Sequence, residues 1–79
     1  MKLDILYFGL VAEAIKCVQE EFVLESKITV KQLKDLLINK YAELGKLSYQ
    51  IAVNQQLVNP QTVITEDCEI AILPPFAGG

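Results

Sequence analysis

The stretch "ITVKQLKDLLINKYAELG" (residues 28–45) decides the fold, because it predicts the main helix of the chain. Thr29 is a favourable N-cap, and Gln32 three residues later completes a capping box. Apolar residues then recur at spacings of three and four, which predicts one buried stripe. The stripe consists of Val30, Leu33, Leu36, Leu37, Tyr41 and Leu44. Gly45 is the predicted stop, since the residue after a helix often takes a positive φ.

The segments on either side of this helix have the alternating pattern of strands. "KLDILYF" (2–8) is apolar on both faces, which places it near the middle of a sheet. "GLVAEAIK" (9–16) predicts a short helix, and "EEFVLE" (20–25) predicts a second strand whose pairing sense stays open. Further strands are expected at 49–54, 55–59 and 69–73, with 60–68 as a connection. Pro74 and Pro75 end the last strand, because proline cannot donate to a ladder.

This order predicts an α+β fold in which one amphipathic helix crosses one face of a mixed sheet of four to five strands. The second face of the sheet must then meet either solvent or a partner. A chain of 79 residues has room for one domain. We expect that domain to occupy 1–75, with 76–79 as a flexible C-terminal tail.

The composition excludes several classes of function. Seven lysines, no arginine and a net charge of −3 speak against a nucleic-acid binder. Without histidine and with only Cys17 and Cys68, a four-ligand zinc site cannot be built, and both cysteines are expected to be buried apolar residues. No apolar run reaches the roughly 20 residues of a membrane span, and the N-terminus is not a convincing secretory signal. We therefore expect a cytoplasmic protein without a membrane or metal.

The ending "EIAILPPFAGG" (69–79) points to a family when it is taken together with "ILYFGLVAE" (5–13) and "AVNQQLV" (52–58). With these segments the chain resembles the ubiquitin-like β-grasp proteins, and within them the small, sulfur-carrying subunits of molybdopterin synthase. The resemblance covers essentially the whole chain. Its most specific part is the Pro-Pro-X-X-Gly-Gly ending with "AVNQ" upstream of it.

The resemblance implies a chemistry for Gly79. A free carboxylate has a pKa of about 3.3–3.7 and is a poor electrophile when ionised, so sulfur cannot displace its oxygen directly. In the family an E1-like activating enzyme uses ATP to adenylate the last glycine, and a sulfur donor converts it to a thiocarboxylate. The large subunit of the synthase takes up the tail, and the sulfur passes to the pterin precursor. The carrier itself is not an enzyme and binds no cofactor.

The resemblance also implies which residues meet partners in a hetero-oligomer with the large subunit. Gly78, without a Cβ, lets the tail thread a narrow channel. The expected partner-binding residues are Phe8, Leu57, Leu73, Pro74, Pro75, Phe76 and Ala77. Many family members have an Arg-Glu pair after the first strand, where this chain has Ala12 and Glu13. A charged contact to the partner is therefore expected to be missing or replaced.

Other functions stay open from the residues alone. A sulfur carrier for thiazole synthesis or a ubiquitin-like protein modifier would use the same activated glycine. A stand-alone enzyme has little support, and Glu20 and Glu21 are interpreted as a solvated strand end rather than a catalytic pair. A pure interaction module predicts that deleting Gly78 and Gly79 leaves function intact, whereas the carrier hypothesis predicts its complete loss.

Overall fold

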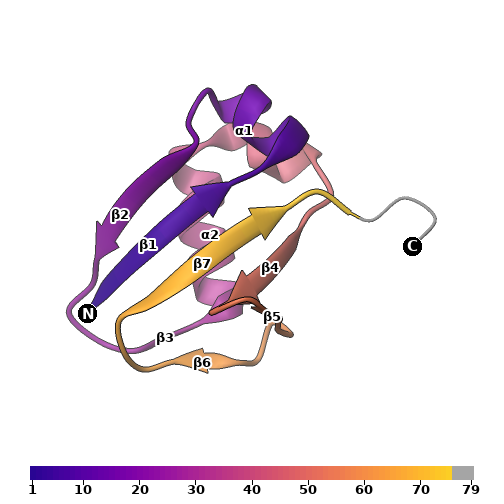
Figure 1. Ribbon diagram of the computed structural model, residues 1–79. Helices are drawn as coiled ribbons and strands as arrows, with labels where there is room; N and C mark the ends of the chain where they lie inside the picture. Colours follow the sequence, from indigo (N-terminus) through magenta and orange to yellow (C-terminus); the bar gives the residue numbers. More distant parts are fainter. Residues whose placement is uncertain (76–79) are drawn as a thin grey trace.

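The computed structural model describes residues 1–75, in which a helix crosses one face of a five-stranded sheet (Figure 1). The elements follow in the order β1 (Lys2–Tyr7), α1 (Gly9–Ile15), β2 (Gln19–Val23), β3 (Ile28–Thr29), α2 (Val30–Lys40), the 3-10 helix η1 (Ala42–Lys46), β4 (Gln50–Val53), β5 (Gln56–Leu57), β6 (Val63–Ile64) and β7 (Cys68–Leu73). The predicted sequence of strand, short helix, strand, main helix and strands is confirmed.

The main sheet has the strand order β2-β1-β7-β4-β5. β1 pairs with β7 in parallel, and the other pairs of this sheet are antiparallel, which settles the open pairing sense of β2. β1 therefore has a neighbour on each side, as its two apolar faces predicted. β7 lies at the centre of the sheet, so the last described strand is held on both edges.

Helix α2 begins at its predicted capping box. The Gln32 amide donates to Thr29 Oγ1 at 3.1 Å, and the Thr29 amide donates to Gln32 Oε1 at 2.9 Å. These two bonds satisfy amides that the first turn of a helix leaves without partners. Val30 and Leu33 then point into the core and are buried.

The predicted C-terminal end of this helix was wrong. α2 ends at Lys40, Tyr41 takes an extended conformation with φ −127° and ψ 92°, and η1 follows as a separate turn. Gly45 lies inside η1 and does not stop α2. Leu36 was also wrongly placed in the buried stripe, because 38% of it is exposed. Of the predicted stripe, α2 does bury Val30, Leu33 and Leu37.

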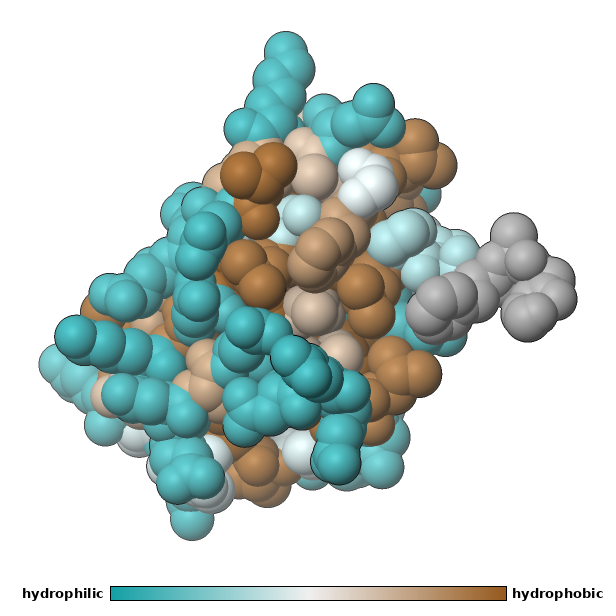
Figure 2. All heavy atoms as spheres, in the orientation of Figure 1, coloured by the Kyte–Doolittle hydropathy of each residue, from teal (hydrophilic) through white to brown (hydrophobic). Residues whose placement is uncertain are grey.

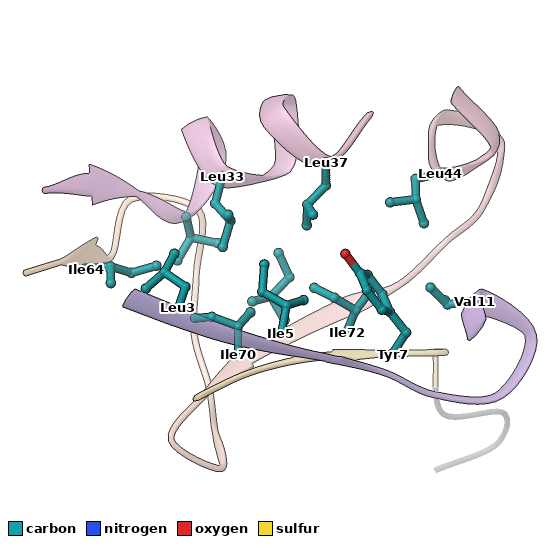
Figure 3. Packing of buried hydrophobic residues seen from close by; sticks show 12 residues of the cluster. Leu3, Ile5, Tyr7, Val11, Leu33, Leu37, Leu44, Ile64, Ile70 and Ile72 are labelled. Atoms are coloured by element: carbon teal, nitrogen blue, oxygen red, sulfur yellow. The ribbon is translucent and has the colours of Figure 1, made fainter. Parts of the chain in front are cut away.

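The core lies between the sheet and the helices (Figure 3). Leu3, Ile5 and Tyr7 of β1 and Ile70 and Ile72 of β7 point toward α2 and η1. The helical side contributes Leu33, Leu37 and Leu44. Each fully buried aliphatic side chain stabilises the fold by about 1.5–3 kcal/mol relative to an exposed one. The core therefore uses only one face of each central strand.

Two further predictions need correction. The stretch 60–68, expected to be a connection, contains β6, which pairs with β3 in a separate two-stranded sheet. Cys17 and Cys68 are half-buried rather than buried, and both are free thiols. None of the helices within residues 1–75 is long and apolar enough to cross a membrane.

Candidate docking face and tail exit

The end of β7 fixes where the C-terminal tail leaves the sheet. β7 ends at Leu73, and Pro74 and Pro75 follow, the first half-buried and the second exposed. Because β7 pairs with both β1 and β4, this exit point is anchored to the rigid centre of the sheet. Phe76, Ala77, Gly78 and Gly79 lie outside the described residues, so their roles stay predictions.

Gly9 packs closely against the first residue of the exit. It has a φ of +56°, and a Cβ added there would lie 3.1 Å from Cγ of Pro74. The Phe8 amide beside it donates to the Ile72 carbonyl at 3.1 Å. The start of α1 thus holds the end of β7 in place. Sequence reasoning missed this role, although a glycine between the first strand and a helix was its visible signal.

The sheet face opposite α2, hereafter the open face, has an apolar row across four strands. The register aligns Leu6 with Ala71, Ala71 with Ala52, and Ala52 with Leu57. Because directly paired residues point to the same side of a sheet, these four side chains form one continuous row. We call it the apolar row, and Figure 2 shows hydrophobic residues gathered over the middle of this face.

The predicted partner residues of the sheet lie on this open face. Leu57 belongs to the apolar row and is 58% exposed. Phe8 is 43% exposed and continues the alternation of β1 in extended conformation, while Leu73 alternates with the buried Ile72. The structure thus brings Phe8, Leu57 and Leu73 to one face beside the tail exit. Their predicted contact with a partner remains a prediction.

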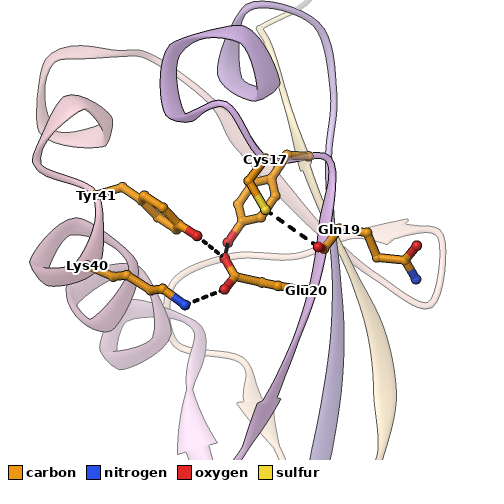
Figure 4. Close-up of polar contacts among 6 residues, drawn as sticks. Cys17, Gln19, Glu20, Lys40 and Tyr41 are labelled. Carbon is orange, nitrogen blue, oxygen red and sulfur yellow. Dashed lines mark hydrogen bonds and ion pairs between the residues drawn. The ribbon is translucent and has the colours of Figure 1, made fainter.

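Glu20 is not the solvated strand end that the sequence suggested. It lies on the core side of β2, where the hydroxyls of Tyr7 and Tyr41 both donate to its Oε2 at 2.6 Å (Figure 4). Lys40 pairs with its Oε1, and 14% of the Glu20 side chain is exposed. Glu21, in contrast, is exposed as expected. The cluster ties the edge strand β2 to the end of α2.

The electrostatics of this cluster follow from burial and hydrogen bonding. Burial raises the pKa of Glu20, but the hydrogen bonds from Lys40, Tyr41 and Tyr7 outweigh it and hold the pKa below its ordinary value of 4.5. The pKa values of the two phenols are raised, first by burial and then by their bonds to the Glu20 carboxylate. The cluster is therefore a structural clasp with an ionised centre at neutral pH.

Comparison with known proteins identifies the family. The sequence model of the ThiS family matches residues 5–79, nearly the whole chain. The chain belongs to the ThiS family. A curated relative, the molybdopterin synthase sulfur carrier subunit of Mycobacterium tuberculosis, is 37% identical over 82 residues, covering 100% of this chain and 99% of the relative.

Two solved structures extend the comparison of this ThiS family member. A Pyrococcus furiosus protein assigned as molybdopterin converting factor subunit 1 has a TM-score of 0.87 and 17% identity, covering 96% of this chain and 99% of that one. This likeness confirms the predicted β-grasp, ubiquitin-like fold. A chain of the Helicobacter pylori complex of subunits 1 and 2 of molybdopterin-converting factor has a TM-score of 0.68 and 27% identity, with 100% of both chains covered.

The names of these relatives agree with the prediction of a small carrier subunit that is not an enzyme by itself. The relative from Mycobacterium tuberculosis is a sulfur carrier subunit by name, and the Helicobacter pylori structure is a complex of two subunits. In the ThiS family member described here, the last described strand is held on both edges and lies next to a partly exposed apolar face.

Proposed function

We propose that this chain is the sulfur carrier subunit of a molybdopterin synthase. The observation that supports it most is the position of the tail exit, at the end of the central strand and beside an apolar face on which Phe8 and Leu57 are exposed. A carrier needs both parts, because its terminus must reach into a partner while its body holds the partner in place. The end-to-end identity of 37% to a named sulfur carrier subunit supports the same role.

The proposed chemistry takes place at the Gly79 carboxylate. An E1-like enzyme forms a mixed anhydride between this carboxylate and AMP, with release of pyrophosphate from ATP. A donor that supplies sulfur at the level of sulfide then attacks the carbonyl and expels AMP, which leaves a thiocarboxylate. No electrons are transferred in these steps. The chain contributes the carboxylate, and the partners contribute the catalytic groups.

The side chains of the chain fit a passive role in this chemistry. The thiol of Cys68 has a raised pKa, first because of burial and then because of the nearby carboxylates of Asp67 and Glu66. It is therefore protonated at neutral pH and is a weak nucleophile. Within residues 1–75 no three Cys, Asp or Glu side chains are arranged so that they could hold a metal ion together. The sulfur is accordingly assigned to Gly79 and not to Cys68.

The proposed partners each act at the open face or the tail. The molybdopterin synthase large subunit would receive the thiocarboxylate in its active site and cover the apolar row, forming a hetero-oligomer. The E1-like enzyme would bind the tail earlier, followed by the sulfur donor system. Pro74 and Pro75 restrict the backbone at the exit and lower the entropy lost when the tail is captured.

The mass of the C-terminal peptide tests this function. The protein would be incubated with an activating enzyme from its own organism, ATP and a sulfide source, beside a variant lacking Gly79. We expect one oxygen of Gly79 to be replaced by sulfur, and no change in the variant. Addition of the large subunit and the pterin precursor should then discharge the sulfur. An unmodified terminus, with the activating enzyme active on another carrier, would overturn the proposal.

A further inference from the structure

The open face also contains a row of three carboxylates. The register places Asp4 opposite Glu21 on one side and opposite Glu69 on the other. Directly opposite residues of an antiparallel pair such as β1 and β2 have Cβ atoms about 4.5–5.5 Å apart, and neighbouring strands such as the parallel β1 and β7 lie about 4.7–4.9 Å apart. Asp4, Glu21 and Glu69 therefore stand side by side across β2, β1 and β7, and we call them the acidic row.

No lysine within residues 1–75 forms an ion pair with the acidic row. Asp4 Oδ1 accepts a hydrogen bond from Gln19 Nε2 at 2.9 Å, which is a neutral donor. The ion pair that the described residues form joins Lys40 to Glu20 on the core side. Like charges directly opposite each other in a sheet are destabilising. The fold thus tolerates an arrangement that weakens it, on the same face as the apolar row, in which Ala52 is buried, Leu6 and Ala71 are half-buried and Leu57 is exposed.

The rows follow a fixed order along the strands. The acidic row comes first, the apolar row second, and Phe8 with Leu73 third, next to the tail exit. Glu69 and Leu73 are separated by four residues, or about 13 Å at roughly 3.3 Å per residue. Figure 2 shows the hydrophobic residues of this face with a band of hydrophilic residues crossing below them.

Four of the seven lysines lie on the helical side of the molecule. Lys31, Lys34 and Lys40 belong to α2, and Lys46 belongs to η1. Lys2, the next residue to Asp4 on the same face of β1, forms no ion pair with it. α2 and η1 also carry Asp35 and Glu43, so lysines outnumber carboxylates on these two elements, while on the open face the three carboxylates of the acidic row stand beside one lysine, Lys2. Such a separation orients a charged partner before contact.

We propose that the acidic row is the electrostatic part of the docking face. It would fit a protein partner whose own apolar patch is bordered by a line of lysine or arginine side chains. That border lies on the side of the patch away from the channel that takes up the tail. This inference rests on the proposed function, in which the partner is the molybdopterin synthase large subunit.

The order of the rows gives the contact a direction. If the partner were rotated by half a turn on the face, its basic border would meet Phe8 and Leu73, and the acidic row would face apolar surface. Burying a carboxylate without a cation is unfavourable, so the rotated complex is disfavoured. In the favoured orientation the tail exit faces the channel. The acidic row thus selects the one docking orientation that delivers Gly79.

Charge neutralisation with a matched control tests the inference. One triple variant is Asp4→Asn, Glu21→Gln and Glu69→Gln on the open face. The control is Glu25→Gln, Asp35→Asn and Glu43→Gln, three exposed positions outside the strands of the sheet. Both triples raise the net charge from −3 to 0, since each removes three negative charges. The measurement is the rate of association with the large subunit of the same organism, by stopped flow over a range of ionic strength.

We expect the open-face triple to associate about tenfold more slowly than the wild type at low ionic strength. The difference should vanish as salt screens the charges, and the control should change association by less than about twofold. The open-face triple should also melt at a higher temperature than the wild type, because the repulsion within the row is relieved.

If the two triple variants associate with the large subunit at equal rates, or the open-face triple associates as fast as the wild type, the proposed role of the acidic row is wrong. The proposed function would not be affected by that result. The wild type would then still bind the large subunit and form the thiocarboxylate. If the wild type itself fails to bind the large subunit and Gly79 stays unmodified, both this inference and the proposed function are wrong. The two failures are therefore distinguishable in one series of measurements.

Discussion

The two faces of the central sheet are built from the same strands and behave differently. On the core face, Ile5 of β1 and Ile70 of β7 are 0% exposed beneath α2. On the open face, the adjacent residues Leu6 and Ala71 are only half-buried, and Leu57 is more than half exposed. The difference shows that apolar residues serve two purposes here. One face gives the fold its stability, and the other keeps apolar surface available for a partner.

The largest expected effect is a difference in stability between substitutions of two neighbouring residues of β1, Ile5 and Leu6. Ile5→Ala removes a fully buried side chain and should lower the free energy of unfolding by about 2–5 kcal/mol, because it leaves a cavity. Leu6→Ala, the matched change on the open face, should cost less than about 1.5 kcal/mol, since that side chain is already half exposed. Urea denaturation measures both values. Equal losses of unfolding free energy in the two variants would contradict the conclusion that only the core face gives the fold its stability.

Glu20 is a charged group on the core face, and its removal should have the next largest effect. Glu20→Gln replaces an ionised acceptor of two tyrosines and one lysine, so we expect a loss of about 2 kcal/mol at neutral pH. Glu21→Gln on the open face is the matched control and should be close to neutral or slightly stabilising. Thermal or urea unfolding of the three proteins measures these differences.

The Glu20→Gln variant also allows a test of how the stability difference from the wild type changes with pH. Because the folded pKa of Glu20 lies below its ordinary value of 4.5, its contribution to stability is present above that value. The contribution is lost as the pH falls through the lower folded value. The gap in stability between wild type and Glu20→Gln should therefore narrow below pH 4.5. A gap that is independent of pH would mean that the clasp does not depend on the ionised carboxylate.

The sequence predicted those parts of the fold that depend on local patterns. The capping box of Thr29 and Gln32 identified the start of α2, and the alternation of β1 identified an internal strand. The C-terminal end of α2 was missed because Tyr41 and Leu44 continue the helical spacing after the helix has ended. The change in backbone direction at Tyr41 does not alter that spacing, so the spacing could not predict it.

Features made by distant residues could not be predicted from local patterns. β6 has two residues, too few to show a period, and it exists because β3 pairs with it. The Glu20 clasp joins residues 13 and 21 positions apart in the chain. The acidic row likewise depends on the register of three strands. Of the candidate site, the resemblance to the family indicated Phe8, Leu57 and Leu73 but not their arrangement around the exit.

Substitution on the open face should affect binding more than stability. We expect Leu57→Ser to weaken the complex with the large subunit about tenfold, or roughly 1.4 kcal/mol, because it removes apolar area from the apolar row. Unfolding should change by less than about 0.5 kcal/mol, since the side chain is 58% exposed. Val63→Ser on β6, 49% exposed, is the control. Equal weakening by both variants, measured by titration calorimetry, would argue against the apolar row.

The smallest effect is expected from a substitution of Gly9, which packs against Pro74 at the tail exit. Gly9→Ala introduces a Cβ at a φ of +56° and 3.1 Å from Pro74, so we expect a loss of stability of about 1 kcal/mol. It should also slow adenylation of Gly79, because the exit is displaced. Gly45→Ala, where the added Cβ would lie 3.7 Å from Ile38, is the control and should be neutral or slightly stabilising. An equally neutral Gly9→Ala would show that the exit tolerates displacement.

The most direct test of the account is methyl cross-saturation in the complex with the large subunit. The chain would be deuterated, with labelled leucine and isoleucine methyl groups, and the unlabelled partner would be irradiated. We predict that the signals of Leu6, Leu57 and Leu73 lose intensity, while those of Ile5, Ile70 and Ile72 do not. Loss of intensity centred on Leu36 of α2 instead would place the partner on the helical side and contradict the account.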